Sequence, residues 1–188
     1  MNNIIRYIGI EKAEEISEFI GDAMRNKGIT SYPHNQITIA EVPKWLCDAI
    51  YEATGGHTDV KGKRFALEAS KIYHEIQSHS NYEKEASRGQ RAYTSSDIFE
   101  IIDAMFSPDI IEDIAHGDNL DQRHTFAIIK CTKQYVIVVL SVGGKRNPNI
   151  TPQQILYFEL EKWKAMEMSD KTVREMLYGE SVKRGVDL

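Results

Sequence analysis

Two apolar segments joined by a short turn, Phe126–Cys131 and Tyr135–Val142, constrain the fold of this chain more than any other feature. Both are short and rich in β-branched and aromatic residues, which is typical of strands. The run from Tyr135 to Leu140 is apolar on both faces, as expected for a central strand that is covered on each side. A third apolar segment, Ile155–Leu160, is predicted to pair with them.

The charge around these strands is distinctive in a protein of net charge −5. Residues 122–158 contain no acid and five bases, which are Arg123, Lys130, Lys133, Lys145 and Arg146. Residues 61–91 add seven bases against four acids, whereas residues 92–121 carry eight acids and no base. These blocks are either separate solvated faces or one basic surface that faces a polyanion.

Apolar spacing and end signals predict helices before and after the strands. They are Ile10–Arg25, Pro43 to about Ala53, about Glu68 to Ser80, a helix with N-cap residues at Thr94–Asp97 that runs to about Phe106, and residues 161–168 and 169–178. Residues 36–40 and 63–67 are candidates for short strands. Residues 81–92 have no periodicity and are predicted to form a loop that is long enough to be functional.

The change from helical to strand periodicity at His124 predicts an α+β fold. We expect a small antiparallel sheet of three to four strands, with helices packed against one face. Residues 1–60 carry their own apolar stripes and are predicted to form an N-terminal helical cap, followed by an α+β domain with C-terminal helices over residues 61–188. The two separated cysteines favour a cytoplasmic location, and no apolar run approaches the roughly 20 residues of a membrane span.

One histidine continues an apolar helix stripe. Ala69, Ile72 and Ile76 follow steps of three and four, and the next position in the series is His79. A polar residue at the core edge, or a cation at a helix C-terminus, would explain it without a function. Alternatively, bases on the sheet would disfavour its protonated form and leave it able to accept a proton. His74 lies on the opposite side and is expected to be exposed.

Several familiar sites are excluded by the sequence. It has no P-loop, no dinucleotide-binding glycine fingerprint and no HExxH motif. The histidines and cysteines lack the spacing of zinc ligands, so we expect no metal ion and no cofactor. The basic glycine loop Gly143–Arg146 could meet a phosphate, although no helix N-terminus follows it.

The order of the predicted elements points to a family. The strands are preceded by a helix that contains Lys71 and ends at His79, and then by a polar loop. A helix follows that starts at Tyr93–Ile98 and ends before Ser107-Pro108-Asp109. This order resembles the phage- and mobile-element-associated BECR (barnase–EndoU–colicin–RelE) nucleases, over about Lys61 to Leu160. The resemblance implies a metal-independent endoribonuclease that cleaves RNA by attack of the 2′-hydroxyl.

Such a reaction needs a base, an acid and cations around the phosphorane, and this chain has residues for each role. The candidate catalytic residues are His79, His124, Arg91 and Thr94. The candidate nucleic-acid-binding residues are Lys71, Arg88, Lys130, Lys145 and Arg146.

Two other classes of protein stay open. The first is a non-enzymatic inhibitor from a mobile element, such as an anti-CRISPR protein that binds a nuclease or its guide RNA, with the acidic residues 97–121 as a mimic of nucleic acid. Inhibition and guide-RNA cleavage could also be combined. The second is a small structural module of a phage or conjugative protein. For a nuclease or an inhibitor, the expected partner is RNA or a host protein–RNA complex.

Overall fold

The computed structural model describes residues 7–29, 34–113, 125–142 and 148–161. Its elements in chain order are α2 (Ile10–Arg25), β1 (Gln36–Glu41), α3 (Lys44–Ala53), β2 (Arg64–Glu68), α4 (Ala69–His79), α5 (Tyr82–Ser87), the 3-10 turn η1 (Ser95–Asp97), α6 (Ile98–Phe106), β3 (Ile110–Asp113), β4 (Thr125–Cys131), β5 (Tyr135–Val142) and β6 (Asn149–Glu159). The bounds of α2 and β5 are those that the sequence predicts.

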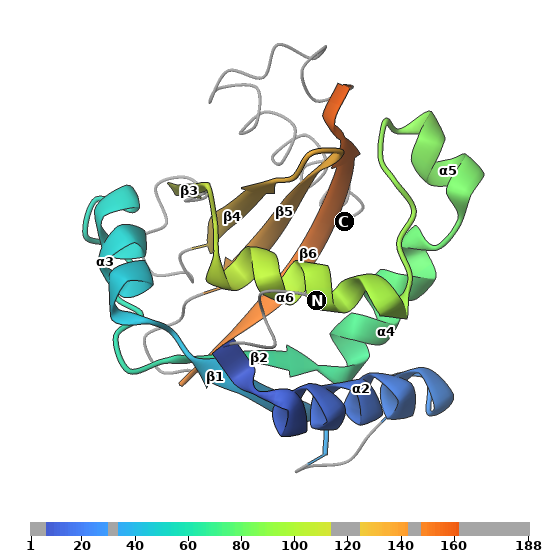
Figure 1. The fold of residues 1–188 in the computed structure, drawn as a ribbon, viewed down its shortest axis with the longest axis horizontal. Coiled ribbons are helices and arrows are strands. Elements are labelled where there is room, and N and C mark those ends of the chain that lie inside the picture. The colour runs from blue at the N-terminus through green and yellow to red at the C-terminus, as the bar shows by residue number, and fades with distance from the viewer. Residues whose placement is uncertain (1–6, 30–33, 114–124, 143–147, 162–188) are drawn as a thin grey trace, which may run out of the picture.

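The strands form one six-stranded sheet in the order β1-β2-β6-β5-β4-β3 (Figure 1). Every neighbouring pair is antiparallel except β2 and β6, which run parallel. A mixed α and β fold with a mostly antiparallel sheet is therefore confirmed, but the predicted three to four strands are too few. The added strands β1, β2 and β3 have six, five and four residues, and segments this short give little periodicity to detect.

Strand β6 joins the two parts of the sheet. Its first residues, Asn149 and Ile150, pair with β2, while the stretch from Thr151 to Glu159 pairs with β5. Pro152 lies within the strand, where it lacks a ladder donor. It sits opposite Ser141, next to a register shift between Leu140 and Ser141, and such a bulge lets a strand accommodate proline.

Side chains alternate between the two faces of the central strands. On the helix-covered face, buried residues of β4, β5 and β6 join residues of α2, α3, α4 and α6 in one hydrophobic core; the strand residues are Phe126, Ile128, Ile137, Val139, Ile155 and Tyr157. In Figure 1, α6 lies across the sheet, where it packs against β4 and β5. Ile16 of α2 and Leu46 of α3 belong to this same core. The predicted cap therefore shares its core with the rest of the chain, and its separability stays a prediction.

The end of α2 brings it close to α4. The helix stops as predicted after Arg25, with Lys27 at φ 52° and Gly28 at φ 71°, a backbone region that glycine adopts without strain. A Cβ atom on Gly28 would come within 2.9 Å of the Ser70 Cα atom. Glycine here therefore serves both the helix stop and the contact between the two helices.

The segment predicted as a loop at residues 81–92 contains the short helix α5, so that prediction is wrong for its first half. Asn81 caps the helix by accepting the Lys84 backbone N–H at 2.9 Å. Glu85 is the only buried residue of α5. The helix therefore has no apolar periodicity from which the sequence could predict it. Within the described ranges, none of the helices combines the length and apolarity needed to cross a membrane.

Candidate functional site

His79 lies at the buried end of α4, as the apolar stripe predicts. Ala69, Ile72 and Ile76 of the same helix are buried with it, and His79 is only 4% exposed. His74 is exposed, which is also as predicted. The helical period alone therefore located both side chains correctly relative to the core.

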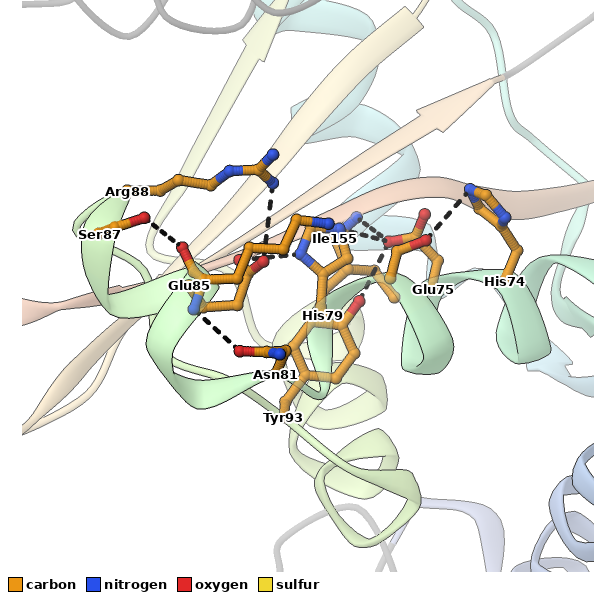
Figure 2. A network of polar contacts seen from close by, with 11 residues as sticks. His74, Glu75, His79, Asn81, Glu85, Ser87, Arg88, Tyr93 and Ile155 are labelled. Carbon is orange, nitrogen blue, oxygen red and sulfur yellow. Dashed lines mark hydrogen bonds and ion pairs between the residues drawn. The ribbon is translucent and has the colours of Figure 1, made fainter.

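Two buried carboxylates flank the His79 ring (Figure 2). Its Nδ1 atom lies 3.0 Å from Glu85 Oε2 and donates a hydrogen bond to it, and its Nε2 atom lies 3.9 Å from Glu75 Oε2. The ring also stacks on Tyr93, with centroids 5.5 Å apart and planes 12° from parallel. Arg88 approaches the other Glu85 oxygen at 3.6 Å. Acids, rather than the bases of the sheet, therefore surround His79, and the predicted cationic surroundings are wrong.

Glu75 ties three parts of the chain together. Its Oε2 atom accepts the Tyr93 hydroxyl at 3.1 Å and the Ile155 backbone N–H at 3.0 Å. These bonds connect α4 to β6 and to the segment that precedes η1. Burial, reinforced by the charge of Glu75, raises the pKa of Tyr93 far above its ordinary value, so the phenol remains a donor. We call Glu75, His79, Glu85 and Tyr93 the buried network.

A second cluster, nearer the surface, is centred on Arg91, two residues before Tyr93 in the sequence. The guanidinium carbon of Arg91 sits 4.5 Å from the ring centroid of Tyr135 and 4.9 Å from that of Tyr157. Its Nη2 atom donates to Asp97 Oδ1 at 3.1 Å, and 28% of the side chain is exposed. Burial alone would lower the pKa of Arg91, but Asp97 and the two tyrosines outweigh it and raise that pKa. The group is therefore a fixed cation.

The backbone holds Arg91 beside the sheet. Its N–H donates to the Tyr157 carbonyl at 2.7 Å, and the preceding residue, Gln90, forms a β-bridge with Phe158. The segment thus extends the sheet along the end of β6. Cation–π contact of this kind stabilises by about 0.5–1 kcal/mol when exposed and more when desolvated.

Thr94 begins the helical turn next to Arg91. Its side chain and that of Asp97 form a reciprocal capping box, in which the Thr94 N–H donates to Asp97 Oδ2 at 2.7 Å. Thr94, Ser95 and Ser96 are exposed, and the Thr94 hydroxyl lies 2.8 Å from that of Ser96 and 3.2 Å from Asp97 Oδ2. The predicted N-cap chemistry is confirmed.

Tyr157 links this cluster to α6. Its hydroxyl donates to Glu100 Oε2, and burial, together with Glu100, raises the pKa of Tyr157 far above its ordinary value. Tyr157 therefore keeps its proton and holds the exposed carboxylate of Glu100 in place. We call Arg91, Thr94, Asp97, Glu100, Tyr135 and Tyr157 the Arg91 cluster.

Lys130 of β4 contacts an acid of the turn between α6 and β3. Lys130 of β4 lies 3.3 Å from Asp109 Oδ1, and the other oxygen of Asp109 accepts the Cys131 backbone N–H at 2.7 Å. Lys130 also lowers the pKa of Asp103 on α6, although burial, the larger effect, raises it overall. One acid of residues 92–121 is therefore paired with one base of residues 122–158.

The structure brings His79, Arg91 and Thr94 of the candidate catalytic set into one region, connected through Tyr93 and Tyr157, whose rings are 6.0 Å apart. Arg88 and Lys130, proposed to bind nucleic acid, are engaged by Glu85 and Asp109. Lys71 lies partly buried on α4. His124, Lys145 and Arg146 lie outside the described residues.

Most residues of the two clusters were missed as site residues, among them Glu75, Glu85, Asp97, Glu100, Tyr135 and Tyr157. One of them had a readable signal, because Glu75 precedes His79 by four residues and such pairs face each other on a helix. Glu85 meets His79 from the next helix, and Tyr157 meets Glu100 across 57 residues, so no helical or strand period relates either pair.

Comparisons with known proteins add no assignment. No family model, no curated protein and no solved structure matches this chain. In the part of the chain that the structure describes, no three His, Cys, Asp or Glu side chains are grouped so that they could hold a metal ion.

Proposed function

We propose that this protein is an endoribonuclease that cleaves RNA without a metal ion, at a site beside Arg91. The observation that carries the proposal is a half-buried guanidinium fixed over two tyrosines, one of which, Tyr157, donates to the exposed residue Glu100. The resemblance to BECR nucleases remains a prediction and adds the expected reaction class.

Arg91 is suited to the charge that develops during the reaction. The attack of a 2′-hydroxyl on the adjacent phosphorus places additional negative charge on the phosphoryl oxygens, which a preorganised cation stabilises. Arg91 is held by Asp97 and by two ring faces, so it loses little freedom on binding. The exposed hydroxyls of Thr94, Ser95 and Ser96 are additional donors for the same phosphate.

Glu100 is the proton acceptor in this proposal. Its carboxylate takes the proton of the 2′-hydroxyl while the oxygen attacks phosphorus, and the 5′-oxygen leaves with a proton from an acid. We take solvent water as the source of that proton, because Thr125, which follows His124, pairs with Val142, whereas Tyr135 of the Arg91 cluster begins β5 at its other end. The products are a 2′,3′-cyclic phosphate and a 5′-hydroxyl.

His79 takes a supporting role. Its burial and its bond to Glu85 keep it from the RNA, in contrast to the general-base role that the sequence suggested. The Tyr93 backbone N–H donates to the His79 carbonyl at 3.1 Å, and the two rings stack. We infer that His79 positions the segment that carries Arg91 and Thr94.

The test is cleavage of end-labelled single-stranded RNA in the presence of EDTA. We expect products with 2′,3′-cyclic phosphate ends. Glu100→Gln should slow cleavage by about two to four orders of magnitude, as loss of a general base does. Arg91→Lys keeps the charge but loses the planar fork, and should slow cleavage by about two orders of magnitude.

Matched controls on α2 separate these effects from changes in overall charge. Glu18→Gln and Arg25→Lys alter an exposed acid and an exposed base on that helix and should cleave at the wild-type rate. If all four variants behave alike, the Arg91 site is wrong. Tight RNA binding with no cleavage by the wild-type protein would instead favour the non-enzymatic inhibitor.

The inhibitor reading draws little support from the described part of the acidic block. Asp97 and Asp109 are paired with Arg91 and Lys130. Acids committed to their own chain make a poor mimic of a nucleic-acid backbone, since such mimicry needs free negative charge.

A further inference from the structure

Helix α5 is attached to the rest of the protein through a charged side chain. Glu85 is the only buried residue of this six-residue helix, and Tyr82 at its start is 71% exposed. The Glu85 carboxylate reaches the His79 ring on α4 at 3.0 Å (Figure 2). A surface helix is ordinarily held by an apolar face. Helix α5 has none, so its attachment depends on the contact between Glu85 and His79.

The groups that face His79 come from four elements. Helix α4 contributes the Glu75 carboxylate, 3.9 Å from the ring Nε2 atom. Helix α5 contributes Glu85 and Arg88, whose charged atoms lie 3.6 Å apart. The segment before η1 contributes the Tyr93 hydroxyl, and β6 contributes a backbone N–H, both of which donate to Glu75. Among the described residues, two carboxylates therefore face one guanidinium, and His79 is the group that can carry the second positive charge.

Two features favour a protonated imidazole at His79. Glu75 and Glu85 are 6% and 0% exposed, and buried charges need compensation. Arg88 supplies it only in part, because 38% of its side chain is exposed. In addition, a neutral ring that donates from Nδ1 would leave a lone pair on Nε2, 3.9 Å from a Glu75 oxygen. A protonated ring has two donors and so removes both the charge imbalance and the repulsion between acceptors.

We propose that His79 is a proton switch, which holds α5 in place while its ring is protonated and releases α5 when the ring loses that proton. Loss of the proton leaves one buried carboxylate uncompensated, and movement of Glu85 into water relieves this imbalance. Helix α4 stays in place, because Ile72 and Ile76 anchor it in the hydrophobic core. Helix α5 has no such anchor, so it is the element that moves.

Release of α5 would also loosen the residues that follow it. The Gln90 backbone N–H donates to the Glu85 carbonyl at 2.9 Å, and Gln90 forms the bridge to Phe158. Arg91 comes next and donates to the Tyr157 carbonyl at 2.7 Å. The switch therefore controls how firmly Arg91 is held beside β6. It concerns the attachment of α5 and does not depend on RNA cleavage, so its test needs no substrate.

The attachment of α5 should weaken as the pH rises. Unfolded histidine has a pKa of about 6.5. A contribution that requires protonated His79 is complete below that pH and is lost at higher pH, as the ring deprotonates in the folded protein. In the pH range of this loss, each unit should increase the opening of α5 by up to about tenfold.

Hydrogen–deuterium exchange of the full-length protein tests the switch, with rates corrected for intrinsic exchange at each pH. Between about pH 6 and pH 9, we expect protection of the Gln90 and Arg91 amides to fall by at least about tenfold, while α2 stays protected. Constant protection of the two amides would overturn the proposal. A parallel loss in α2 would also overturn it, because the whole fold would then be opening.

Three variants assign the response to the pair of His79 and Glu85. His79→Gln removes the titrating ring, and Glu85→Gln removes the carboxylate that deprotonation leaves uncompensated, so protection of the two amides should not vary with pH in either variant. His74→Gln changes an exposed histidine of the same helix and should keep the wild-type response. If His79→Gln does not fold, Glu85→Gln decides the question. A pH dependence that persists in Glu85→Gln would show that another group operates the response, and the proposal would be wrong.

Discussion

The buried network and the Arg91 cluster are joined by residues 91–97 but differ in how far their charged groups are exposed to solvent. Glu75, Glu85 and His79 of the network are buried. Their polar atoms therefore rely on hydrogen bonds to neighbouring protein groups instead of solvent. The Arg91 cluster holds its ions at a partly exposed surface. The segment of residues 91–97 serves both, since Tyr93 points inward while Arg91, Thr94 and Asp97 remain accessible.

The comparison indicates which cluster is free to act on a ligand. Buried ion pairs often contribute little net stability, but removing one partner is costly because the other charge is left buried. The network therefore behaves as a structural clamp that a ligand cannot enter without unfolding it. The Arg91 cluster can exchange partners at much lower cost, so substitutions there should change binding and catalysis more than stability.

The largest expected effect is on stability and comes from His79→Ala. It would leave Glu85, which is fully buried, without its 3.0 Å partner, and should lower the free energy of unfolding by about 3–5 kcal/mol. Urea denaturation measures this change. His74→Ala removes an exposed histidine from the same helix and should change stability by less than about 0.5 kcal/mol. Equal stability of the two variants would show that the network is not a clamp.

A smaller effect is expected for Tyr93→Phe, which removes only the hydroxyl that donates to Glu75. Loss of a hydrogen bond to a charged group should lower the free energy of unfolding by about 1.5–3 kcal/mol at neutral pH. Urea denaturation at pH 7 measures this loss. Wild-type stability in this variant would show that Glu75 is satisfied without Tyr93.

The same variant should change the response to alkali. An unfolded tyrosine ionises near pH 10, whereas the raised pKa of Tyr93 keeps it protonated in the fold. Its contribution is therefore present below about pH 10 and is lost as the pH rises, by about 1.4 kcal/mol per unit. Tyr93→Phe should flatten that alkaline slope by the loss of one such group, and an unchanged slope would contradict the assignment.

The smallest effect is expected beside the Arg91 cluster, at Asp103. Burial raises the pKa of this carboxyl, and its Oδ1 atom has no hydrogen-bond partner. A raised pKa means that the protonated form is favoured in the fold, so stability is lost as the pH rises through that pKa. Asp103→Asn should therefore stabilise the protein slightly at pH 7, and the gain should vanish near pH 3. Thermal denaturation at the two pH values measures it. A loss at pH 7 would show that the attraction of Lys130 dominates.

Local sequence determined much of the fold. Apolar period and end signals fixed α2 and β5, and they also showed that His79 faces the core while His74 does not. These outcomes are local because a helix or strand can bury its apolar face only when that face has the matching period. The N-cap residues at Thr94–Asp97 were visible for the same reason, and the structure adds that Thr94 and Asp97 form a reciprocal capping box.

Only the tertiary structure decided which groups meet across long separations. Glu75 accepts the backbone N–H of Ile155, 80 residues away, and Asp109 meets Lys130, 21 residues away. The acidic block of residues 92–121 and the basic block of residues 122–158 are separate in the sequence, yet Asp109 and Lys130 bring them into contact. Composition gives the sign of each block, but the partner of a charge depends on sheet order and helix placement. Sheet order and helix placement follow from packing of the whole chain. Packing brings certain charges close together, and these charges must then pair because an unpaired buried charge is costly.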